Sequence, residues 1–112
     1  MRIGYFGAST GSAAALVAAA KLGARVGAVV SRGGRPDLAG AANLAVVKAP
    51  TLLLVGSNDE KVLELNQSAL EYLNCEKQLT VVPRATHLFQ EPGTLEAVAR
   101  HGALWFQRHH FI

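Results

Sequence analysis

Short apolar runs alternate along the chain with longer segments whose apolar residues recur at helical spacing. The apolar runs have the length of β-strands and lie at residues 2–6, 25–31, 51–55 and 78–82. The helical segments lie at residues 10–22, 60–73 and 94–108, with a shorter candidate helix at 38–44. Strands that are almost continuously apolar are typical of a parallel sheet that is buried on both faces.

The alternation of strand and helix predicts an α/β fold, with a mostly parallel β-sheet of about four strands and helices on both faces. Right-handed crossovers would put the helices at 10–22 and 60–73 on one face, so only the last helix can cover the other face. That helix should pack through a stripe of apolar or small residues, namely Leu95, Val98, Ala99, Gly102, Trp105 and Phe106. No repeat or linker divides the chain, so we expect residues 1–112 to form a single domain.

The most specific chemical signal is the pentapeptide Gly7-Ala8-Ser9-Thr10-Gly11, which joins the first predicted strand to an alanine-rich helix. A serine with a glycine two residues away on each side is typical of a nucleophile elbow, which exposes the hydroxyl on a sharp turn. Side chains at Gly7 and Gly11 would collide in such a turn. Ser9 is therefore the candidate nucleophile, and the backbone N–H of Thr10 at the helix start is a candidate oxyanion donor.

Two further residues complete a possible catalytic relay. Asp59 follows the third predicted strand and His87 follows the fourth, so both should lie with Ser9 at the carboxyl edge of a parallel sheet. The chain order Ser, Asp, His is the order found in α/β-hydrolases. In such a triad His87 would take the proton of Ser9, and Asp59 would orient the imidazole and stabilise the imidazolium.

Composition argues against several other classes of function. Eleven Lys and Arg residues against eight Asp and Glu residues give a net charge of +3. The basic residues are scattered singly and form no basic, aromatic-rich run, so we expect no nucleic-acid partner. No apolar stretch approaches the length of a membrane span, so we expect no membrane partner. One cysteine and no recognisable signal peptide favour a cytoplasmic location. His101, His109 and His110 have no carboxylate or thiol at ligand spacing, so we expect no metal site there.

These motifs together resemble the dienelactone hydrolase-like branch of the α/β-hydrolases, and specifically its carboxyl-terminal half. The elbow at residues 7–11, the strand at 49–56 that leads to Asp59, and residues 85–89 that carry His87 bear the resemblance, which covers nearly the whole chain. It implies a half or minimal α/β-hydrolase fold and a carboxylesterase-like serine hydrolase of small esters or lactones, which needs no metal or cofactor. Dienelactone hydrolases proper have cysteine at the nucleophile position, so the substrate does not carry over.

The resemblance also implies that other family members have about four strands before the elbow, with the second oxyanion donor on a loop after one of them. In this chain the first strand, with Ile3 and Phe6, should therefore be an exposed apolar edge. Proteins normally cover or pair such an edge. We expect a homodimer that either pairs the first strand with its mate or buries the thinly covered sheet face, and that is able to place a partner donor near Ser9.

Two alternative functions remain open from the sequence. The chain could be a non-catalytic remnant or interaction module, in which Ser9 and Asp59 merely cap the helices that follow them. Residues 2–32 could instead form a dinucleotide-binding β-α-β unit, with glycines approaching a pyrophosphate and Arg32 reading a 2′-phosphate. The glycines of that alternative are Gly4, Gly7 and Gly11, and their spacing departs from the usual fingerprint.

Overall fold

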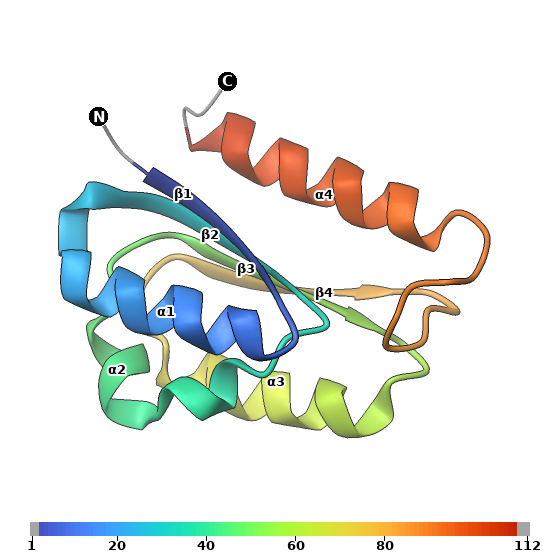
Figure 1. Ribbon diagram of the computed structural model, residues 1–112, viewed down its shortest axis with the longest axis horizontal. Coiled ribbons are helices and arrows are strands. Elements are labelled where there is room, and N and C mark those ends of the chain that lie inside the picture. Colours follow the sequence, from blue (N-terminus) through green and yellow to red (C-terminus); the bar gives the residue numbers. More distant parts are fainter. Residues whose placement is uncertain (1–2, 110–112) are drawn as a thin grey trace.

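The computed structural model describes residues 3–109 (Figure 1). Four strands and four α-helices alternate, with two short 3₁₀ helices, η1 and η2, between them. In chain order the elements are β1 (Ile3–Ala8), α1 (Thr10–Leu22), η1 (Gly23–Arg25), β2 (Val26–Arg32), η2 (Pro36–Ala39), α2 (Ala41–Val46), β3 (Thr51–Gly56), α3 (Glu60–Tyr72), β4 (Lys77–Val82) and α4 (Thr94–Arg108). The predicted α/β fold is confirmed.

The strands form one sheet in the order β1-β2-β3-β4, and every neighbouring pair is parallel. All six residues of β3 are buried, as are six of the seven in β2. The outer strands β1 and β4 are much more exposed. Because all four strands run the same way, their carboxyl ends meet at one edge of the sheet, and the loops after them are brought together there.

The helices cover the two faces unequally, as the crossover rule predicts. Figure 1 shows α1, α2 and α3 on one face and α4 alone on the other. The core on the first face contains Leu16, Val29, Leu44, Ala69 and Leu73. The core under α4 contains Val30, Leu52, Leu54, Val98 and Trp105. Three helices therefore cover one face of the sheet, and α4 alone covers the other.

Most predicted elements agree with the observed bounds to within one residue, but two differ by more. The first strand was expected at 2–6, but Arg2 lies outside the described residues and β1 continues to Ala8, which pairs with Arg32 of β2. The helix expected at 38–44 is divided into η2 and α2, because Gly40 has a φ of 85° and cannot continue a right-handed helix.

The predicted stripe on α4 is partly wrong. Val98, Gly102 and Trp105 are buried as expected, but Leu95 is 49 % exposed and Ala99 is also exposed. Ala99 lies about 100° from Val98 around the helix axis and so turns away from the sheet, whereas Leu95 is on the same side as Gly102 but lies in the first turn of the helix. The buried side of α4 is narrower than the sequence suggested.

Among residues 3–109, none of the helices combines the length and the apolar character that a membrane span requires.

Candidate active site

Ser9 occupies the turn between β1 and α1 in a conformation that non-glycine residues rarely adopt. Its φ is 51° and its ψ is −127°, and the residue is exposed. Its side chain makes no capping hydrogen bond to α1, so the interpretation of Ser9 as a simple helix cap finds no support. Its carbonyl oxygen instead accepts hydrogen bonds from the backbone N–H groups of Ser12 and Arg35, which hold the strained turn in place.

The two glycines of the elbow differ in what they contribute. A Cβ atom on Gly7 would lie 2.8 Å from the Cα atom of Ser12 and 2.9 Å from the carbonyl oxygen of Gly11, so the turn requires glycine there. A Cβ atom on Gly11 would meet nothing within 4 Å. The expected collision at Gly11 is therefore wrong, because this residue already lies on the exposed first turn of α1.

His87, in the loop after β4, lies between Ser9 and Asp59. Its Nε2 atom is 3.3 Å from the Ser9 hydroxyl oxygen, and its Nδ1 atom is 2.8 Å from a carboxylate oxygen of Asp59. An ionised carboxylate only accepts hydrogen bonds, so the proton belongs on Nδ1 and the Nε2 lone pair faces the Ser9 hydroxyl. The structure therefore brings all three predicted side chains together in a continuous chain of hydrogen bonds.

Asp59 stands directly before α3 at the end of a tight connection from β3. Its side chain makes no capping hydrogen bond to α3 and is only 14 % exposed, against 40 % for His87. The turn is fixed to the His87 loop, because the backbone N–H of Asn58 donates to the carbonyl oxygen of Ala85. A Cβ atom on Gly56 would collide with that same carbonyl group, so the two loops pack at backbone distance.

Thr10, the candidate oxyanion donor, is the first residue of α1 and is exposed. The first N–H groups of a helix have no partner within the helix, and the helix dipole makes this end favourable for negative charge. The Thr10 N–H is thus placed one residue after Ser9, at the position that an elbow uses for its oxyanion site.

The loop after β2 packs against the loop that carries His87, and this role was hard to predict from the sequence. Gly33 has a φ of 53°, and a Cβ atom there would lie 3.2 Å from the carbonyl oxygen of His87. The buried Asn66 of α3 donates to the carbonyl oxygen of Gly34. Arg32 stacks over the ring of Phe89 at 5.7 Å. The one signal in the sequence was the pair Gly33-Gly34 directly after a strand, which is typical of a close approach between two backbone segments.

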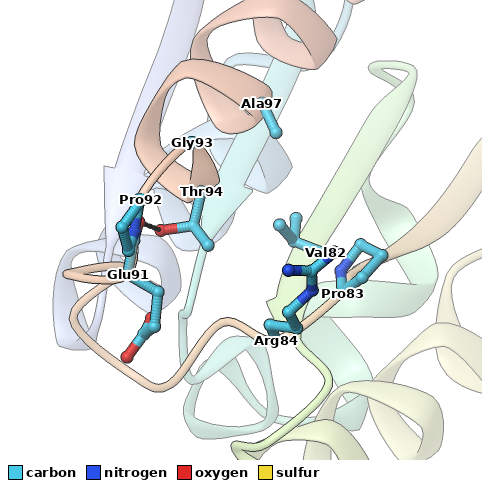
Figure 2. A pocket seen from close by; sticks show the side chains of 8 residues that line it. All are labelled: Val82, Pro83, Arg84, Glu91, Pro92, Gly93, Thr94 and Ala97. Carbon is cyan, nitrogen blue, oxygen red and sulfur yellow. Dashed lines mark hydrogen bonds between the residues drawn. The ribbon is translucent and has the colours of Figure 1, made fainter.

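A hollow of about 460 Å³ opens beside the His87 loop, between the end of β4 and the start of α4 (Figure 2). It is lined by Val82, Pro83, Arg84, Glu91, Pro92, Gly93, Thr94 and Ala97. None of Ser9, Asp59 and His87 lines it. The hollow is therefore next to the loop that carries the histidine and separate from the triad itself.

Comparison with known proteins gives two kinds of likeness. No family model matches the chain. Proteins from two Mycobacterium tuberculosis strains, each named "Putative phosphoribosyl transferase", are 64 % identical over 107 residues, which is 96 % of this chain. The chain spans only 24 % of the length of these curated relatives.

Solved structures give the second likeness. A dienelactone hydrolase from Anabaena variabilis is 57 % identical, with a TM-score of 0.94 over 97 % of this chain and 50 % of its own. The esterase domain of a Rhodothermus marinus protein, at 18 % identity, and a monoacylglycerol lipase from Paleococcus ferrophilus, at 17 %, both have TM-scores of 0.83 and share the fold. The chain therefore resembles the dienelactone hydrolase-like branch of the α/β-hydrolases, as a fragment that spans about half of a solved dienelactone hydrolase.

Proposed function

We propose that this chain carries the serine nucleophile and the acid–base relay of a hydrolase for small carboxylic esters or lactones. The observation that carries the proposal is the hydrogen-bonded series from Ser9 through His87 to Asp59, at 3.3 Å and 2.8 Å. The strained and exposed conformation of Ser9 supports it further, because strain of this kind clusters at functional sites.

The proposed reaction has two halves. The Ser9 oxygen attacks the ester carbonyl carbon while His87 Nε2 takes the serine proton, and the resulting oxyanion faces the Thr10 N–H. The carbon–alkoxy bond then breaks, and the alcohol leaves with the proton from His87. Water next attacks the acyl-serine and gives a proton to His87, and the acid departs as that proton returns to Ser9. Asp59 stabilises the imidazolium in both halves.

The likeness to hydrolases and esterases supports this class of reaction, since the structural neighbours include a dienelactone hydrolase at 57 % identity. The transferase name of the Mycobacterium tuberculosis relatives describes proteins of which three quarters lie outside the match. We infer that the matched quarter is a hydrolase-like segment and that the named activity belongs to the remainder of those relatives.

The proposed site has one identified oxyanion donor among the described residues and needs a second. Thr10 offers one backbone N–H, and loss of one oxyanion donor typically costs about 100- to 1,000-fold in kcat. We propose that a second copy of the chain completes the site, and that the isolated chain is slow. No cofactor or metal takes part in the proposed reaction.

Hydrolysis of p-nitrophenyl acetate tests the proposal. Wild type should show a burst of p-nitrophenol followed by slower turnover, because acylation of Ser9 precedes deacylation. Ser9→Ala should lose the burst, and Asp59→Asn should lower kcat by about 10⁴-fold because the wrong imidazole tautomer is favoured. Ser68→Ala, which changes an exposed serine on α3, is the matched control and should behave as wild type.

A folded wild-type protein with no hydrolysis above the Ser9→Ala background would contradict the proposal. A non-catalytic interaction module would then be the better account. Stabilisation of the folded protein by a nicotinamide dinucleotide in a thermal melt would instead favour the dinucleotide-binding alternative, since a ligand that binds only the folded state raises the melting temperature.

A further inference from the structure

The loop that carries His87 is held in a shape that several independent contacts fix. Arg84 and Phe89 both have positive φ, at 66° and 55°, which is unusual for residues other than glycine. The Phe89 side chain is only 3 % exposed and anchors the loop in the core under α4. The Phe89 N–H also donates to the carbonyl oxygen of Thr86. Such conformations persist only where the surroundings determine them.

A further contact, made by the Glu91 side chain, holds Thr86, the residue before His87. The Glu91 carboxylate accepts a hydrogen bond from the backbone N–H of Thr86 at 3.0 Å and another from the Thr86 hydroxyl at 2.7 Å. Both carboxylate oxygens are used, one for each donor. Both bonds are exposed to water, which weakens charged contacts, but the two oxygens bind two donors of one residue and so restrict the position of Thr86.

Glu91 also contacts Thr94, the first residue of α4. Its carbonyl oxygen accepts hydrogen bonds from the Thr94 N–H at 3.1 Å and from the Thr94 hydroxyl at 2.8 Å. In Figure 2 the bond from the Thr94 hydroxyl is drawn, and the Glu91 carboxylate points away from Ala97. Glu91 thus connects the start of a 15-residue helix, through its backbone carbonyl, to the residue before His87, through its carboxylate.

The ionisation of Glu91 agrees with this role. The hydrogen bonds from the Thr86 hydroxyl and then from the Thr86 N–H lower the pKa of the Glu91 carboxyl. A carboxylate with a lowered pKa remains ionised at neutral pH and keeps both acceptor positions available.

We propose that Glu91 is a positioning residue that, through Thr86, holds the His87 ring in line between Asp59 and Ser9. The Phe89 N–H also contacts Thr86, through its carbonyl oxygen, but Glu91 is the side chain that holds Thr86 directly, and it does so through two hydrogen bonds. A displacement of about 1 Å in a catalytic group can cost about 100-fold in rate, so a hydrogen-bonded clamp at this place controls catalysis without touching substrate.

The kinetic part of this role rests on the function proposed above, whereas the effect on the His87 ring does not. Glu91→Gln keeps the shape of the side chain but presents an amide N–H₂ group to one of the two Thr86 donors. We expect kcat for p-nitrophenyl acetate to fall by about 10- to 100-fold with KM almost unchanged. Glu96→Gln, at an exposed acid in the first turn of α4, is the matched control and should keep wild-type kcat.

Thr86 provides a second pair of variants. Thr86→Val removes the hydroxyl donor and should lower kcat in the same way, while Thr86→Ser restores that donor and should recover most of the activity. A merely structural role would lower the amount of folded enzyme and leave the kcat of the folded fraction unchanged. If Glu91→Gln does not fold, the comparison of Thr86→Val with Thr86→Ser still shows whether the contact between Thr86 and Glu91 controls kcat.

Nitrogen NMR of the imidazole rings gives a readout that needs no catalysis. In wild type the His87 signals should show a single Nδ1-protonated tautomer, and in Glu91→Gln they should shift toward mixed tautomers or broaden by exchange, with unchanged signals in Glu96→Gln. Altered His87 signals with an inactive wild type would uphold the positioning role and overturn the proposed hydrolase. Wild-type kcat together with unaltered His87 signals in Glu91→Gln would overturn the positioning role.

Discussion

Ser9 has a backbone conformation that costs about 1–3 kcal/mol in a residue other than glycine. It is stabilised by two hydrogen bonds to its carbonyl oxygen, and its hydroxyl oxygen lies 3.3 Å from the nearest imidazole nitrogen. The glycine-flanked serine could be predicted from the sequence, because the pattern itself is specific. The second hydrogen bond to its carbonyl could not, because Arg35 reaches Ser9 only through the folded loop after β2.

Other residues of the site differ in how far the sequence indicated them. Asp59 and His87 could be predicted because each follows a recognisable strand, and parallel strands bring such positions to one edge. Asn66 and Glu91 gave no signal, since they act on backbone groups of Gly34 and Thr86. Contacts to backbone atoms leave no characteristic residue pair in the sequence.

The free cysteine gives a prediction about pH. Burial raises the pKa of the Cys75 thiol, and a hydrogen bond to the Thr51 hydroxyl opposes this shift with a smaller effect. Because the folded protein favours the neutral thiol, this contribution to stability is present at neutral pH and is lost as the pH rises through the raised pKa. Reaction with a disulfide reagent should be slower in the folded protein than in the denatured protein until the pH is well above neutral. Equal rates at neutral pH would contradict this prediction.

At the scale of elements, the positions of strands and long helices followed from apolar periodicity. Helix α1 and helix α4 were predicted with their observed bounds, Thr10–Leu22 and Thr94–Arg108. The division of η2 from α2 was missed because it depends on the positive φ of Gly40. The exposed side of α4 was missed because the sequence does not show how many strands one helix covers.

The turn between β1 and α1 gives a matched pair of variants. Gly7→Ala should lower the free energy of unfolding by about 1–3 kcal/mol, because the added methyl group would overlap the backbone of Ser12 and Gly11. Gly11→Ala should be neutral or raise it by up to about 1 kcal/mol, because its Cβ atom enters open space on a helix. Urea denaturation followed by circular dichroism measures both. An equal loss in the two variants would mean that the turn has a different shape.

At the scale of the whole molecule, the sheet has an apolar edge at β1. Within residues 3–109, β1 pairs with β2 alone, and Ile3 and Phe6 are 43 % and 53 % exposed. An exposed edge strand is a template for pairing with another chain. The topology that makes this edge was predictable from the order of the strands, whereas a homodimer that covers it stays a prediction, because strand periodicity carries no mark of a pairing partner.

We predict that the protein forms a homodimer through this edge. Sedimentation velocity should give the mass of a dimer at micromolar concentration, and Phe6→Lys should shift the equilibrium toward the monomer because a charge is placed in the contact. Leu88→Lys, which changes another exposed apolar residue on the His87 loop, is the control for added charge. A wild-type monomer at all concentrations, or an equal effect of both variants, would contradict pairing through β1.

The central claim is that Ser9 is an activated nucleophile, and intact mass after exposure to a fluorophosphonate probe tests it most directly. Wild type should gain the mass of one adduct, with loss of fluoride as the serine oxygen bonds to phosphorus. Ser68→Ala should gain the same adduct, and Ser9→Ala should gain none. An unlabelled but folded wild type, or an adduct that persists in Ser9→Ala, would contradict the claim.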